Sequence, residues 1–244
     1  FFLLIIAKSI TAKPTFLTNL SNRRLQNSIE SLRQEMDIPG ASIAVIDNGE
    51  ISWAKGFGIA DKITQREVTT STLFTANSIT KVQTSLAVVK LLADKGIALD
   101  EPVNRYLKSW KIPENQFTAK VPVTFRMLLN HTAALTSPYP DGCCGPKEIL
   151  PTVKQFLNGK PPATNPPVTV NNVPGEKYAY CNGCYSVLQP AIEDVGDKPF
   201  KRLMNELVIQ PAKMMNSTFN DEFFLEDSSA IAIPYDSDGS VHKK

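Results

Sequence analysis

The chain has 244 residues, enough for one large domain or for an α/β body that carries a helical lobe. Charged residues make up 20% of the chain and the net charge is +2, with basic residues clustered only in the closing His242-Lys243-Lys244. A nucleic-acid-binding surface needs a concentrated basic patch, so this composition argues against a nucleic-acid partner.

The first residues form a short apolar segment. Residues 1–7 are all apolar, and Lys8 ends a run that is too short to span a bilayer. The run is typical of the end of a secretory signal sequence, with Ile10-Thr11-Ala12 as a small-residue cleavage site; a buried N-terminal strand is the alternative. We therefore expect a signal remnant over residues 1–12, a single domain over residues 13–244, and export to the periplasm or the cell exterior.

The next segments predict a helix followed by a β-hairpin. Apolar residues recur at helical spacing between Leu17 and Met36, and the pattern ends before Pro39, as helices tend to do. Residues 41–46 and 51–58 are rich in β-formers and flank a turn that contains Asn48-Gly49. Two such runs around an Asn-Gly turn indicate an antiparallel hairpin.

A long helix is predicted from Ser78 to Lys95, with Gly96 ending it. Its apolar residues hold a period of 3.6, so we expect most of the helix surface to face inward. These residues are Val82, Leu86, Val89, Leu92 and Ala93.

The remaining chain reads as short helices and turn-rich loops. Helices are predicted from Val123 to Leu129, with a cap near Thr124, from Tyr185 to Val195, and from Pro199 to Val208. A hairpin, a long helix and a mainly helical lobe indicate an α+β fold with an antiparallel sheet flanked by helices, and we expect that sheet to be incomplete within this chain.

Ser78 and Lys81 are the first candidates for chemistry. Residues three apart share a helix face, so the hydroxyl and the amine can touch, and a neighbouring base is what activates a serine nucleophile. The same S-x-x-K spacing at Ser52 and Lys55 falls in a predicted strand, where residues i and i+3 point to opposite faces. Helical placement therefore favours Ser78 and Lys81.

Tyr180 and Asn182 form the only Tyr-x-Asn in the chain. They follow Pro174-Gly175 and precede a predicted helix, so they lie on a loop whose side chains can point into a cleft. Beside Ser78 and Lys81, a phenol would relay protons and a carboxamide would form hydrogen bonds with an amide or ester substrate. The alternative for Tyr180 is a half-buried ring with a structural role.

The four cysteines fall into two pairs, Cys143 with Cys144 and Cys181 with Cys184. A bridge between the pairs would close a loop of about 40 residues and contribute about 4 kcal/mol in the chain-entropy model. A structural disulfide or unpaired thiols are favoured over a redox C-x-x-C or a four-cysteine zinc site.

Several ordered motifs resemble the class C β-lactamase-like and D-alanyl-D-alanine peptidase group of penicillin-recognising serine hydrolases, between about Ile38 and Phe219. Four stretches carry the resemblance beyond the lead into the first strand: Ser78-Ile79-Thr80-Lys81, Leu128-Leu129-Asn130-His131-Thr132-Ala133-Ala134-Leu135, Tyr180-Cys181-Asn182-Gly183-Cys184-Tyr185, and Gln210-Pro211-Ala212-Lys213-Met214.

The resemblance implies roles for individual residues. Ser78 would attack a carbonyl and form an acyl-enzyme, while Lys81 and Tyr180 share the proton transfers. Asn182 would hold the substrate amide, and the N–H of Ser78 would form half of an oxyanion hole. His131 would have a structural role at a helix end. The implied substrate is a small molecule or peptide: a β-lactam, a D-Ala-terminated cell-wall peptide or an ester.

Departures from the family pattern bear on these roles. Ala134 stands where the family has glycine after His-Thr, Cys184 stands where it has glycine before the tyrosine, and Ala212-Lys213 replaces Leu-Gly. The third box, Lys or His followed by a small residue and Gly on a late strand, has no match after Asn182. We therefore expect a partial chain, poorly active or inactive as it stands.

Two alternatives to a serine hydrolase remain. One is a non-catalytic relative that binds peptidoglycan or another ligand, and the other is a thiol-redox protein built on Cys181 and Cys184. The sequence carries no metal, nucleotide or flavin motif, so no cofactor is expected.

Overall fold

The computed structural model describes residues 19–138, 151–220 and 228–242. The signal remnant expected over residues 1–12 and the pair Cys143-Cys144 lie outside these ranges. The described parts of Phe1–Thr75 and Glu222–His242 form one compact unit, and those of Ala76–Asp221 belong to a second. The single domain expected over residues 13–244 stays a prediction.

The first unit is built on the predicted hairpin. Strands β1 (Gly40–Asp47) and β2 (Glu50–Asp61) pair antiparallel, and the two-residue strand β3 (Arg66–Glu67) extends the sheet in the order β1-β2-β3. Asn48 and Gly49 connect β1 to β2 with φ of 51° and 81°. Both residue types tolerate positive φ, which the favoured two-residue hairpin turn requires, so the hairpin forms where the sequence predicts it.

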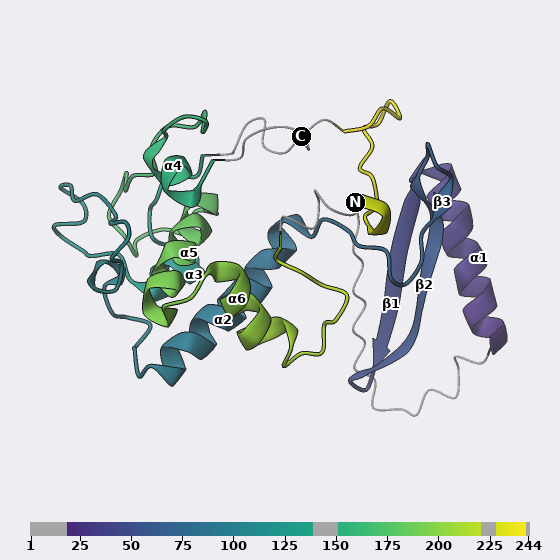
Figure 1. Cartoon of the computed structure of the whole chain (residues 1–244), viewed down its shortest axis with the longest axis horizontal. Helices are drawn as coiled ribbons and strands as arrows, with labels where there is room; N and C mark the ends of the chain where they lie inside the picture. Colours follow the sequence, from purple (N-terminus) through teal and green to yellow (C-terminus); the bar gives the residue numbers. More distant parts are fainter. Residues whose placement is uncertain (1–18, 139–150, 221–227, 243–244) are drawn as a thin grey trace. The chain divides into compact units, whose positions relative to one another are not determined.

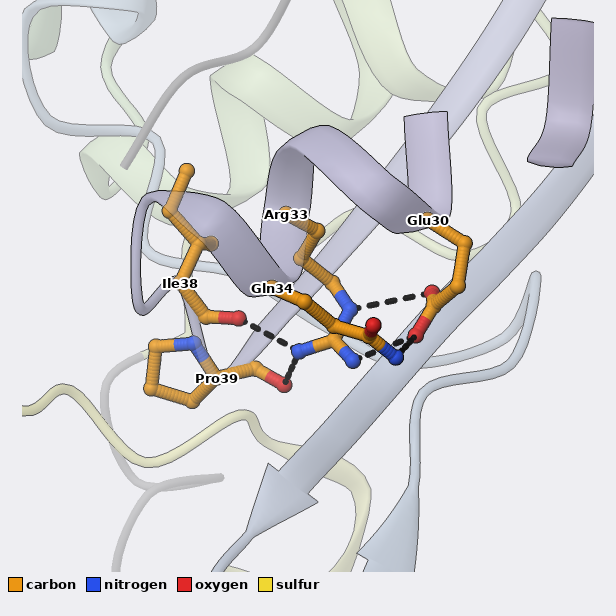
Figure 2. A network of polar contacts seen from close by, with 5 residues as sticks. All are labelled: Glu30, Arg33, Gln34, Ile38 and Pro39. Carbon is orange, nitrogen blue, oxygen red and sulfur yellow. Dashed lines mark hydrogen bonds and ion pairs between the residues drawn. The ribbon is translucent and has the colours of Figure 1, made fainter. Parts of the chain in front are cut away.

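Helix α1 (Asn19–Glu35) lies beside this hairpin in Figure 1, and the short turn η4 (Ser228–Ala230) belongs to the same unit. Arg33, near the C-terminal end of α1, holds the chain that leads into β1. Figure 2 shows its guanidinium between the carboxylate of Glu30 and two backbone carbonyls. One nitrogen, Nη1, donates to the carbonyls of Ile38 at 2.6 Å and Pro39 at 3.1 Å. The other two guanidinium nitrogens, Nε and Nη2, donate to the two carboxylate oxygens of Glu30. One planar cation therefore joins the helix to the residues that lead into β1.

Removing this cation is expected to loosen the first unit. Arg33→Met keeps much of the aliphatic stem but removes the cation that bonds to Glu30 and to the carbonyls of Ile38 and Pro39. We expect the unit to lose about 2 kcal/mol of stability. Hydrogen exchange of the β1 and β2 amides measures the loss. Arg23→Met, on an exposed turn of the same helix, is the control; equal protection in both variants would contradict the assigned role.

The second unit is mainly helical. Its elements are η1 (Asn77–Ile79), α2 (Thr80–Asp94), η2 (Val103–Arg105), α3 (Phe125–Leu129), α4 (Val153–Asn158), α5 (Asn182–Gly196), α6 (Phe200–Met204) and the π-helical turn η3 (Asn205–Ile209). Thr124 caps α3, as predicted, because its side chain accepts from the N–H of Met127. The sequence predicts one helix from Pro199 to Val208, and the structure has α6 followed by η3.

One hydrophobic core joins α2, α3, α4 and α5, whose ribbons lie together in Figure 1. Its most buried large side chains include Leu92, Val103, Leu107, Phe125, Leu128, Leu157, Val187, Leu188 and Ile192. The sheet of the first unit and the helices of the second confirm the predicted α+β class.

Within the second unit, only part of the apolar surface of α2 is buried. Leu92 is buried, but Val82, Leu86 and Val89 are 61%, 58% and 45% exposed. The buried side of the helix instead carries Thr84, Ala87, Val88, Leu91 and Leu92. The helix is apolar on two sides, so a 3.6 period fits either side, and within the second unit only one of them packs on the other helices.

Two of the three replaced glycines stand where the backbone is left-handed. Ala134 has φ of 53° and Lys213 has φ of 55°, in the region that glycine occupies most readily. Lys213 closes the end of η3, with the N–H of Met214 donating to the carbonyl of Ile209. Cys184 lies inside α5. A side chain at positive φ therefore has a backbone cost at Ala134 and at Lys213, whereas Cys184 has no such cost.

No helix among the described residues is long and apolar enough to cross a membrane.

Candidate active site

Ser78 lies at the point where η1 runs into α2. Asn77, immediately before it, has φ of 45°, a left-handed conformation that asparagine adopts more readily than most residues. The hydroxyl of Thr80 donates to the carbonyl of Asn77 and fixes this turn. The turn leaves Ser78 exposed at the head of the helix, one helical turn before Lys81.

Three of the predicted site residues meet at the Ser78 hydroxyl. Lys81 Nζ donates to Ser78 Oγ at 3.1 Å, and the Tyr180 hydroxyl donates to the same oxygen at 2.7 Å. Lys81 Nζ also lies 5.1 Å from the centroid of the Tyr180 ring. All three residues belong to the second unit, although 102 residues of chain separate Ser78 from Tyr180.

The electrostatics of this cluster favour a proton acceptor at Tyr180. Hydrogen bonding to Lys81, and then to Ser78, lowers the pKa of the Tyr180 phenol below its usual value. Together these hydrogen bonds outweigh the burial that favours the neutral phenol, and the charge of the ammonium adds a smaller effect in the same direction. A phenol with a lowered pKa beside a serine hydroxyl is suited to accept the serine proton.

Two residues that support Lys81 were not predicted from the sequence. Tyr185 lies beneath the ammonium, with its ring centroid 5.5 Å from Nζ, and its hydroxyl is 2.8 Å from Ser85 Oγ. Ser85 in turn donates to the backbone carbonyl of Lys81. A signal was available, because Ser78, Lys81 and Ser85 recur at helical spacing and therefore share one face of the helix.

His131 also lies beside the cluster, just after α3. Its Nδ1 accepts from the backbone N–H of Cys181 at 3.1 Å, and its ring centroid is 4.7 Å from that of Tyr180 and 5.4 Å from that of Tyr185. Burial first, and then the charge of Lys81, lower the pKa of His131, so the imidazole is neutral at pH 7. Its Nδ1 is thus bound to the backbone, which fits the structural role at a helix end that the resemblance implies for His131.

Asn182 is the first residue of α5, where its backbone N–H donates to Ser137 Oγ at 2.8 Å. Its half-buried carboxamide has no hydrogen-bond partner among the described residues, so the side chain is free to bind a polar group. Gly183 fixes this end of the helix, because a Cβ there would stand 2.4 Å from the carbonyl oxygen of Thr136.

Cys181 and Cys184 form a disulfide with each other. A bridge from this pair to Cys143 or Cys144 is therefore not the arrangement found. Residues i and i+3 at the start of a helix have a Cα–Cα distance of 5.3 Å here, within the range that a disulfide spans. Both cysteines are buried, at 2% and 0% exposure, which does not suit a redox motif that must meet a partner thiol.

The second S-x-x-K has no part in the site. Lys55 lies in β2 and donates to Gln26 Oε1 of α1 at 2.9 Å, as the strand placement of Ser52 and Lys55 led us to expect. Among the described residues, no cluster of three or more His, Cys, Asp or Glu could hold a metal ion.

Comparison with known proteins gives consistent results. The sequence model of the family described as Beta-lactamase matches residues 25–231. Protein flp of Staphylococcus aureus (strain MW2) is 26% identical over 227 residues, which are 92% of this chain and 43% of that protein. Esterase EstB of Burkholderia gladioli is 35% identical over 112 residues, 46% of this chain and 28% of that enzyme.

A solved structure shows the same fold. The octameric penicillin-binding protein homologue from Pyrococcus abyssi matches with a TM-score of 0.73 at 27% identity, over 91% of this chain and 50% of that one. The chain spans half or less of the length of each of these three proteins.

Proposed function

This chain belongs to the β-lactamase family, and from that premise we propose that it is a serine hydrolase that forms an acyl-enzyme on Ser78. The observation that carries the proposal is the convergence of Lys81 Nζ and the Tyr180 hydroxyl on Ser78 Oγ, at 3.1 Å and 2.7 Å. A serine with a base within hydrogen-bond reach, and a second group that holds the base in place, is the usual arrangement for nucleophilic catalysis.

The reaction proceeds in two steps. Ser78 Oγ attacks the carbonyl carbon of the substrate, and its proton passes to the Tyr180–Lys81 pair and then to the leaving alcohol or amine. A water molecule next attacks the acyl-enzyme carbonyl and gives up a proton through the same pair, and Ser78 regains its hydroxyl. Tyr180 and Lys81 are close enough to titrate as a coupled unit, so the base is the pair.

The substrate classes that fit this chemistry are esters, β-lactams and amides such as D-alanyl peptides. The names of the relatives include an esterase and a penicillin-binding protein homologue, which supports testing an ester and a β-lactam. The free carboxamide of Asn182 is suited to hold the amide or ester group of such a substrate through hydrogen bonds.

Covalent labelling tests the proposal. The protein is mixed with a p-nitrophenyl ester or with a fluorescent penicillin, quenched at times from milliseconds to minutes, and weighed intact. We expect a mass increase equal to the acyl group, located by fragmentation on Ser78 within the tryptic peptide 67–81. Heat-unfolded protein, which has the same serines without the site, is the control.

Two outcomes would contradict the proposal. The absence of an adduct with both reagents, in protein that binds peptidoglycan fragments, would indicate a non-catalytic ligand-binding relative. Disulfide-reductase activity that depends on Cys181 and Cys184, with no labelling of Ser78, would indicate a thiol-redox protein.

A further inference from the structure

Two hydrogen bonds from one residue bracket Tyr180. The carbonyl oxygen of His131 accepts from the N–H of Ala179 at 2.9 Å, and its Nδ1 accepts from the N–H of Cys181 at 3.1 Å. These are the residues immediately before and after Tyr180. The imidazole also packs against the Tyr180 ring, with centroids 4.7 Å apart.

The backbone of His131 supports an assignment beyond simple packing. Its φ is 64°, in the left-handed region that is uncommon for residues other than glycine. At His131 the carbonyl and the ring nitrogen both bind residues of the same short segment, Ala179 and Cys181. Backbone strain of this kind is retained where the surrounding contacts require it.

We infer that His131 is a positioning residue, which as a neutral imidazole holds Tyr180 against Lys81 and Ser78 and which releases Tyr180 when it is protonated. The inference rests on the proposed function, since the position of Tyr180 matters for the rate only if Ser78 is acylated. It also makes a claim about Tyr180 that can be tested without any reaction.

The effect of protonation follows from the tautomer. An N–H donated to Nδ1 requires a lone pair there, so the neutral ring carries its proton on Nε2. A proton on Nδ1 would remove the acceptor of the Cys181 N–H and would add a second positive charge near Lys81. The titratable groups that face the ring are Lys81 from α2, Tyr178 and Tyr180 before α5, and Tyr185 on α5. None of these four is a carboxylate that would stabilise the imidazolium.

Two substitutions separate the hydrogen bond from the backbone conformation. His131→Asn tolerates positive φ, places an amide oxygen close to the position of Nδ1, and cannot be protonated. His131→Gly also tolerates positive φ but provides no acceptor and no ring. The two variants therefore differ in the contacts that residue 131 makes with the Tyr180 segment, while both tolerate its positive φ.

The activity test compares acylation rates between pH 4.5 and 8 with a p-nitrophenyl ester. For the asparagine variant we expect an acylation rate at pH 7.5 within about threefold of wild type. Below the pH optimum, the slope of its log rate against pH should be smaller than that of wild type by one, because one protonation no longer affects the rate. The glycine variant should be about 10–100-fold slower at pH 7.5, because a small misplacement of a catalytic group has effects of that size. Equal slopes in wild type and the asparagine variant, or an unimpaired glycine variant, would overturn the inference.

A second measurement does not depend on activity. The Tyr180 phenol is titrated by NMR of protein with ¹³Cζ-labelled tyrosine, with its signal assigned from Tyr180→Phe. We expect its pKa to stay low in His131→Asn and to rise toward the free value of about 10 in His131→Gly, where the ring leaves the ammonium. An unchanged titration in His131→Gly would refute the inference even in an active enzyme. If the expected titrations occur without acylation of Ser78, the proposed function fails while the positioning role stands.

Discussion

Lys81→Met is expected to slow acylation of Ser78 by about 10³-fold, within the range measured for removal of a general base. Methionine has nearly the same length but has no charge and no donor. The substitution removes the Lys81–Ser78 hydrogen bond and the largest cause of the lowered pKa of Tyr180. The Tyr180 pKa should then rise toward about 10, so less phenolate forms at neutral pH.

The residual activity of Lys81→Met should therefore move to higher pH. Burst kinetics with a p-nitrophenyl ester between pH 6 and 10 measure both the acylation rate and the shift of its pH dependence. Ser78→Ala gives the background rate without the nucleophile. Lys90→Met is the matched control, since Lys90 is an exposed lysine on the same helix, paired with Asp94 and not with the site. A tyrosine whose titration did not change in Lys81→Met would contradict the electrostatic role assigned to the ammonium.

Gly58→Ala is expected to destabilise the first unit by about 3–5 kcal/mol, more than any other substitution considered for that unit. Gly58 has φ of 68°, and a Cβ there would stand 2.3 Å from the carbonyl oxygen of Pro39 and 2.8 Å from Arg33 Cζ. These are the carbonyl and the guanidinium that join α1 to β1. An added methyl group would therefore strain the backbone and displace this junction at the same time.

Gly49→Ala separates the two contributions. Gly49 has φ of 81°, and a Cβ added there would have no atom within 4 Å, so alanine meets only the conformational cost of about 1–2 kcal/mol. Hydrogen exchange of the β1 and β2 amides reports both variants in the same hairpin. Equal losses of protection at the two positions would show that the contact with Pro39 and Arg33 is not what makes Gly58 necessary.

Features with a local cause could be predicted from the sequence. The Asn48-Gly49 turn supplies its own positive φ angles, and Thr124 caps the helix that starts next to it, so neither depends on distant contacts. Ser78 and Lys81 share a helix face through their spacing alone. Their pairing with Tyr180 was expected from chemistry and family resemblance, and the structure places the three hydroxyl and amine groups together.

Features set by packing could not be predicted in the same way. The period of α2 does not distinguish its two apolar sides, so it does not predict that Val88 and Leu91, and not Val82 and Leu86, pack on the core of the second unit. Cysteine spacing does not decide between a bridge across the two pairs and the Cys181–Cys184 bond. The hold of His131 on Tyr180 depends on a left-handed backbone angle at one residue and on rings brought together from separate parts of the chain.

The sheet-bearing unit is discontinuous in sequence. After the helical unit, the chain returns at residues 228–242: Leu73 exchanges hydrogen bonds with Ala230 and Ala232, and Ile233 donates to Ala60. Arg66 reaches the carbonyl of Ile231 across 165 residues of sequence. During synthesis, a ribosome must therefore produce the entire helical insertion before the partners of Leu73 and Ala60 emerge. Because closing so long a loop is entropically costly unless the insertion is already compact, prior folding of the helical segment would assist completion of the sheet-bearing part.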